Sequence, residues 1–229
     1  MKKLIVLLLA LLLAASVGPR LASAAVGETL SGGWTPSESF ELTAERQAIF
    51  DKGLEDLVGV NYTPVAYLGS QVVAGTNHVF LAEATVVYPG AQPTCVLVYL
   101  YEDLQGQVQL MNVADLGILP QADGSLAAPE EGLLGGWAYA ESPEVTDEMK
   151  ARLDKAMEEL AGVSCVPVAN LGIQVVAGLN RCLLCQLTPV VPDAQPHYAL
   201  VYVYEDLQGG AELLQTIDLD VGSLCTYGA

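Results

Sequence analysis

The chain has 229 residues, of which 52% are hydrophobic, and its formal net charge at pH 7 is −18. The hydrophobic content excludes a disordered chain. The negative charge argues against nucleic acid and anionic lipid as partners, because both carry negative charge themselves.

The first 24 residues are predicted to be a secretory signal peptide. Lys2 and Lys3 precede an apolar run from Leu4 to Val17, and Ala22-Ser23-Ala24 supplies the small residues of a cleavage site. The run is too short to span a membrane comfortably. We therefore expect a secreted protein, extracellular or periplasmic, with no membrane contact after the peptide is removed.

The remaining sequence is a tandem duplication. Three short segments recur 103 positions later: "GGW" at 32–34 and 135–137, "QVVAG" at 71–75 and 174–178, and "YEDLQG" at 101–106 and 204–209. Alignment of residues 32–118 with 135–221 needs no gap and gives 45 identities in 87 positions. Such self-similarity at a fixed offset indicates a repeated structural unit.

The duplication predicts two domains, at residues 27–118 and 135–229, which we call module one and module two. Residues 119–134, "LPQADGSLAAPEEGLL", are predicted to form the linker. Their Pro, Gly, Ala and acidic residues suit an exposed connector.

Each module is predicted to begin with one helix. In module one an apolar stripe predicts a helix from Glu41 to Val58. In module two Ser142 is the predicted N-cap, followed by Pro143 in the first turn. Gly59 and Gly162 are predicted to end the two helices.

Four predicted strands follow the helix in each module. In module one they cover 61–73, 76–88, 94–102 and 107–116, which are rich in Val, Tyr, Thr and Phe. Hairpin turns are expected at Ala74-Gly75 and at Gln105-Gly106. One helix followed by a four-strand meander is an α+β pattern.

This order of elements carries a family resemblance. A diglycine, a single helix, a "QVVAG" hairpin that continues into an Asn, and a second hairpin resemble the cystatins, inhibitors of papain-like cysteine proteases. The resemblance implies an α+β fold class with two tandem cystatin-like domains, each one helix wrapped by a four- to five-stranded antiparallel sheet. It implies a reversible inhibitor whose partners are papain-like cysteine proteases. An enzyme is not expected, and neither is a cofactor.

The resemblance also implies which residues contact the protease. In the family, the N-terminal segment and the two hairpins form a wedge that enters the protease cleft. In module one the matching residues are Gly32, Gly33, Gln71, Val72, Val73, Ala74, Gly75 and Leu104. In module two they are Gly135, Gly136, Gln174, Val175, Val176, Ala177, Gly178 and Leu207. No catalytic residue and no metal ligand is implied.

The second hairpin departs from the family pattern. Many cystatins carry Pro-Trp there, whereas this chain has "YEDLQG". Leu104 and Leu207 are the candidate apolar contacts, and a plain polar turn is the alternative. The alternative function is a secreted, non-inhibitory cystatin-like module that binds a peptide, a glycan or a host protein. Trp34 and Trp137 are expected to pack on the core rather than to contact a protease.

Five cysteines leave at least one thiol unpaired within the chain. A bond between Cys165 and Cys185 across the predicted hairpin is one possibility, and the connectivity stays open. Cys182-Leu-Leu-Cys185 has the spacing of a redox motif, but strand residues three apart face opposite sides of a sheet. Structural cysteines, buried or disulfide-bonded, are therefore favoured over a redox or zinc site.

Overall fold

The computed structural model describes residues 33–116 and 136–225, apart from residue 159. The signal peptide, the linker, Gly32 and Gly135 lie outside the described residues. The elements of module one are β1 (Trp34–Pro36), α1 (Ala44–Leu54), β2 (Val60–Val73), β3 (Gly75–Val86), β4 (Thr94–Glu102) and β5 (Val108–Asp115). Those of module two are β6 (Trp137–Tyr139), α2 (Asp147–Met157), β7 (Val163–Val176), β8 (Gly178–Pro189), β9 (His197–Glu205) and β10 (Ala211–Leu219).

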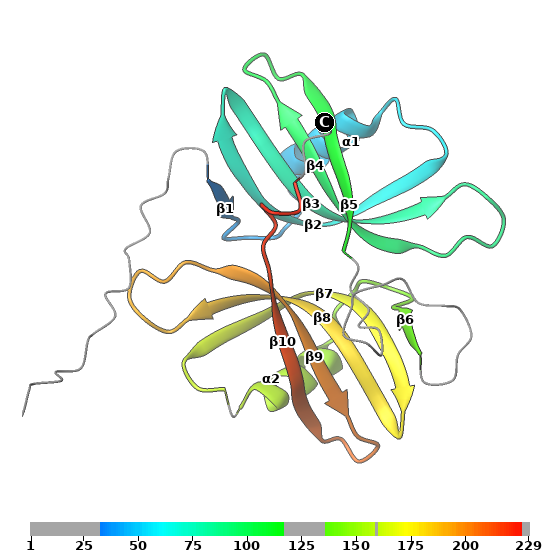
Figure 1. Cartoon of the computed structure of the whole chain (residues 1–229), viewed down its shortest axis with the longest axis vertical. Coiled ribbons are helices and arrows are strands. Elements are labelled where there is room, and N and C mark those ends of the chain that lie inside the picture. The colour runs from blue at the N-terminus through cyan, green and yellow to red at the C-terminus, as the bar shows by residue number, and fades with distance from the viewer. Residues whose placement is uncertain (1–32, 117–135, 159, 226–229) are drawn as a thin grey trace, which may run out of the picture.

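In the described part of each module, five antiparallel strands form one sheet in which neighbouring strands follow one another along the chain (Figure 1). The four strands predicted for module one are confirmed to within two residues at each end. Both predicted hairpins are also present. The short strands β1 and β6 were not predicted, because three residues are too few to show a periodicity. They are held by pairing with β2 and β7, with Trp34 opposite Gln71 and Trp137 opposite Gln174.

Both helices are shorter than the sequence predicts. Each has 11 residues, and the side chain of Thr43 or Thr146 caps it by accepting a hydrogen bond from the backbone N–H three residues on. The predicted cap at Ser142 is therefore wrong. Gly59 and Gly162 do adopt positive φ angles, of 90° and 88°, but they lie in the loops beyond the helix ends.

The strands bury side chains on both faces of each sheet. On one face of module one, Phe50 of α1 packs against Phe80 and Leu100. In module two the corresponding face of the second sheet packs against Leu153 of α2. The opposite faces of the two sheets meet in a single cluster, the shared core, to which both modules contribute leucines: Leu68, Leu81, Leu97, Leu171, Leu184 and Leu200. The layers therefore run helix, sheet, sheet, helix.

This arrangement overturns the predicted fold class. Within the described residues the chain is mostly β, with two five-stranded antiparallel sheets and two short helices, and it does not match two tandem α+β domains of the cystatin-like type. The physical reason is visible in β4, where six consecutive residues from Cys95 to Leu100 are buried. A helix covers one face of a sheet only, so the second face is buried against another sheet.

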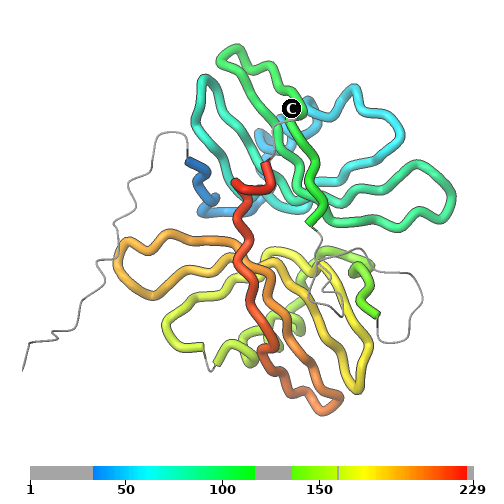
Figure 2. Tube along the Cα trace, in the orientation of Figure 1, coloured from blue at the N-terminus to red at the C-terminus, as the bar shows by residue number. Residues whose placement is uncertain are grey.

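Polar contacts also join the two modules. The hydroxyl of Tyr99 donates to the carbonyl of Val221 at 2.6 Å, and Asn112 Nδ2 donates to the carbonyl of Leu224 at 3.1 Å. The C-terminal segment that follows β10 thus lies against module one (Figure 2). Of the helices in the described ranges, none is long and apolar enough to cross a membrane.

Candidate functional site

The predicted wedge residues gather at one end of each sheet. The strand pairing places Gly33, which precedes β1, beside the end of β2, and it does the same for Gly136 beside β7. The partner glycines, Gly32 and Gly135, lie outside the described residues. We call the grouped residues Gly33, Val72, Val73, Ala74 and Leu104 the module-one edge, and Gly136, Val175, Val176, Ala177 and Leu207 the module-two edge.

The first hairpin of each module exposes apolar side chains at its tip. Val72 and Val73 are 72% and 41% exposed, and their counterparts Val175 and Val176 are 65% and 41% exposed. The turn closes on Gly75 or Gly178, with φ angles of 134° and 143° that side-chain-bearing residues rarely adopt. The glycine therefore permits a tight turn that holds two valines in solvent.

The Gln at the start of each motif has a structural partner. Asn77 Nδ2 donates to Gln71 Oε1 at 2.7 Å, and Asn180 donates to Gln174 at 2.6 Å. These side chains stand opposite each other across the hairpin. Gln71 and Gln174, predicted as protease contacts, thus brace the hairpin, and the repeated Asn is explained by the same bond.

The two hairpins of a module are fixed side by side. The hydroxyl of Tyr101 donates to the carbonyl of Ala74 at 2.6 Å, and Tyr204 repeats the bond to Ala177 at 2.8 Å. A Cβ on Gly75 would collide with the carbonyl oxygen of Glu102. The lack of a side chain at this glycine is therefore what lets the second hairpin approach the first.

The second hairpin is a structured turn with an apolar residue at its tip. The carboxylate of Asp206 accepts hydrogen bonds from the backbone N–H groups of Gln208 and Gly210, both at 2.7 Å. Asp103 makes the equivalent bonds in module one, at 2.9 and 2.8 Å. The carboxylates of Asp103 and Asp206 are thus directed at the backbone of the turn, while Leu104 and Leu207 are 79% and 82% exposed.

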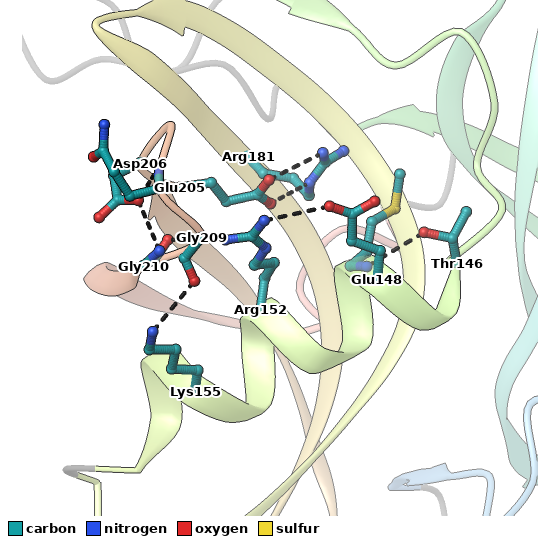
Figure 3. A network of polar contacts seen from close by, with 11 residues as sticks. Thr146, Glu148, Arg152, Lys155, Arg181, Glu205, Asp206, Gly209 and Gly210 are labelled. Atoms are coloured by element: carbon teal, nitrogen blue, oxygen red, sulfur yellow. Dashed lines mark hydrogen bonds and ion pairs between the residues drawn. The ribbon is translucent and has the colours of Figure 1, made fainter.

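The helix supports the second hairpin from below. In module two, Lys155 donates to the carbonyl of Gly209 at 3.2 Å, and Arg152 donates to that of Gly210 at 3.4 Å (Figure 3). In module one, Lys52 donates to the carbonyl of Gly106. These contacts tie the outermost turn of the edge to the helix.

The Asp206 turn gives a prediction for local stability. Hydrogen bonds from Gly210 and Gln208 lower the pKa of Asp206 below its ordinary value of 3.8. The stabilisation is therefore complete above that value and is lost as the pH falls through the lowered pKa. Asp206→Ala is expected to raise the amide exchange rates of Gln208 and Gly210 severalfold at neutral pH, as measured by NMR. Glu212→Ala, on the exposed side of β10, should leave these rates unchanged; equal effects of the two variants would contradict the assignment.

A pair of ionisable side chains lies beneath each edge, and its chemistry differs between the modules. In module two Arg181 Nε contacts Glu205 Oε1 at 2.7 Å, with side chains 9% and 15% exposed (Figure 3). In module one His78 Nε2 lies 3.4 Å from Glu102 Oε2, and Tyr67 OH lies 3.0 Å from His78 Nδ1. Sequence reasoning missed this site, although the 103-residue offset aligns His78 with Arg181.

The tryptophans and the Cys182-Cys185 motif, for which the sequence predicts structural roles, pack within the protein. Trp34 and Trp137 pack edge-on against Tyr99 and Tyr202, with ring centroids 5.6 and 5.4 Å apart, which confirms their packing role. Cys182 belongs to the shared core, whereas the Cys185 side chain lies on the helix face of the same sheet. Their predicted placement on opposite faces is therefore confirmed.

Comparison with known proteins adds no family assignment. No protein-family model matches this chain, and no curated protein matches it. The functional interpretation therefore rests on the sequence motifs and on the geometry of the two edges.

Proposed function

We propose that this chain is a secreted, reversible inhibitor of papain-like cysteine proteases, and that each edge enters the active-site cleft of one protease. The observation that carries the proposal is the pair of exposed valines at each first hairpin, with an exposed leucine fixed beside it. The proposal does not depend on the predicted fold class, because each edge consists of three segments that the strand pairing brings together locally.

The composition of the edge suits entry into a narrow cleft. Val72, Val73 and Ala74 present apolar surface on short side chains, which lose little rotamer entropy when they are buried. The hydrogen bonds of Tyr101 and Asp103 hold both turns before any partner arrives. A preorganised surface binds more tightly because less ordering opposes association.

The two edges lie at opposite ends of the molecule. The hairpin tips of module one are at the top of Figure 1, and those of module two are at its bottom. This separation favours the simultaneous binding of two proteases to one chain. Against clustered targets, the second binding event would then benefit from a raised local concentration.

A titration of papain tests the proposal. Mature protein is expected to inhibit two papain molecules per chain. Val73→Asp and Val176→Asp should each reduce the stoichiometry to one inhibited papain per chain. Each substitution should weaken papain binding at the altered edge at least 30-fold, because a buried charge at an interface centre costs about 2 kcal/mol or more. The double variant should not inhibit at the same protein concentration.

The chain offers a matched control for these substitutions. Val87 and Val190 are 62% and 70% exposed and follow β3 and β8 at the end opposite to the edge. Val87→Asp and Val190→Asp should leave inhibition intact. Full papain activity in the presence of micromolar wild-type protein would remove the proposal and leave the alternative, a non-inhibitory binding module.

A further inference from the structure

Cys165 and Cys185 lie on neighbouring antiparallel strands with their side chains on the same face. In the pairing of β7 with β8, Cys165 stands opposite Leu187 and Cys185 stands opposite Pro167. The two cysteines are thus diagonal neighbours, and both pack in the cluster beneath α2. Each thiol is the largest influence on the pKa of the other, which agrees with this close placement. Diagonal neighbours on one face lie about 7–8 Å apart, so a bond between these two cysteines requires the strands to move slightly closer together.

The pair is particular to module two. The 103-residue offset aligns Cys165 with Tyr62 and Cys185 with Ala82. These two residues belong to one cluster on the helix face of module one. Both positions therefore face the helix in both modules, and module two has a thiol at each of them.

The environments of the two thiols differ in a way that suits a stepwise reaction. Cys165 is half-buried, and the hydrogen bond from Cys185 lowers the pKa of its thiol. Cys185 is buried, and that same bond, together with its burial, raises the pKa of its thiol. Because the thiolate is the nucleophile, Cys165 is the thiol prepared to attack.

The remaining thiols are poorer candidates. Burial raises the pKa of Cys95 to about 12 and that of Cys182 to about 12. Burial also raises the pKa of Cys225, in the C-terminal segment. Among the five cysteines, Cys165 and Cys185 are therefore the pair best suited to react, because they are diagonal neighbours on adjacent strands.

We propose that Cys165 and Cys185 form an intramolecular disulfide when the protein meets a small disulfide oxidant, and that this bond fastens β7 to β8 beneath α2. The Cys165 thiolate attacks one sulfur of the oxidant, forms a mixed disulfide and releases the first thiol of the oxidant. Cys185 then loses its proton and attacks the Cys165 sulfur, which forms the protein disulfide and releases the second thiol. Two protein thiols are oxidised, and one disulfide is reduced to two thiols.

The test uses reduced full-length mature protein and oxidised glutathione as the probe. After the reaction, free thiols are alkylated under denaturing conditions, and the protein is analysed by intact mass and by peptide mapping. We expect the protein to lose the mass of two hydrogen atoms and the Cys165 and Cys185 peptides to be linked. The urea midpoint of the oxidised protein should also rise, because the bond restricts the unfolded chain.

Two variants make the assignment specific. Cys182→Ser should still form the bond, whereas Cys165→Ser should not. A linkage of Cys185 to Cys182 or Cys95, or five alkylated thiols after prolonged oxidation in wild-type protein, would overturn the inference. Because the wild-type reaction is read directly by mass, a folding defect in either variant leaves the test valid. Papain inhibition is not part of the readout, so this inference stands or falls independently of the proposed function.

Discussion

Leu68→Ala is expected to lower the free energy of unfolding by about 2–5 kcal/mol and to destabilise both modules together. Leu68 is fully buried on the face of β2 that meets the second sheet. Its removal leaves a cavity in the shared core, to which Leu81 of module one and Leu171 of module two both belong. The substitution should therefore reduce the stability of both modules.

Each module carries one tryptophan, and this allows the two responses to be separated. Urea unfolding would be followed by fluorescence in Trp34→Phe and Trp137→Phe backgrounds, so that each signal reports one module. Coincident transitions are expected, with both midpoints shifted by Leu68→Ala. Val87→Ala, at a 62% exposed position, should shift neither. A module-two midpoint that does not respond to Leu68→Ala would show that the modules unfold independently.

The strands of this chain were predictable because their sequence signals are local. Runs such as "TCVLVYLYE" combine strand-preferring residues with turn residues at both ends, and the structure has a strand at these residues. The hairpin at Ala74-Gly75 was equally predictable, because a glycine with a positive φ angle is required there. The duplication then transferred each assignment to module two.

The fold class was not predictable from the same signals, because it depends on which surface each face meets. The run in β4 is apolar at every position, which indicates burial on both faces. The prediction assigned one face to the helix and left the other without a partner. In the structure α1 buries only Phe50 fully, and Leu57, placed on the predicted helical stripe, is 40% exposed and lies beyond the helix. Much of the core is instead formed between the two sheets.

The segments of each edge are identifiable in the sequence because they are short repeated motifs, and their role as protease contacts stays a prediction. The strand pairing brings Gly33, the first hairpin and the second hairpin together in module one. The supporting contacts were not predictable, because they join residues far apart in the sequence. Lys52, for example, reaches the carbonyl of Gly106 across 54 positions. Similarly, the His78–Glu102 and Arg181–Glu205 pairs join neighbouring strands whose register the sequence does not specify.

The second large effect is expected at the pair beneath the module-two edge. Arg181→Met should lower the free energy of unfolding by about 3–5 kcal/mol, because it leaves the carboxylate of Glu205, whose side chain is only 15% exposed, without its cation. Within the described ranges, Arg181 is the one cation in contact with Glu205, and Arg181 also donates to Asn170 Oδ1 at 3.2 Å. Replacement of both partners, as Arg181→Met with Glu205→Leu, should recover most of the loss. Urea unfolding at pH 7.5 measures all three free energies.

The matched control is His78→Met at the equivalent position of module one, and it should cost less at pH 7.5. Burial lowers the pKa of His78 below its ordinary value of 6.5, against the opposing influence of Glu102 and Glu45 and with a smaller contribution from Arg46. His78 is therefore neutral at pH 7.5, and its loss leaves no buried charge unpaired. Below pH 6.5 the unfolded chain binds this proton first, so wild-type stability should decline as the pH falls toward the lowered pKa. His78→Met should remove that decline in stability, whereas Arg181→Met should retain it. Equal losses of unfolding free energy from the two substitutions at pH 7.5 would show that Arg181 does not neutralise a buried charge on Glu205.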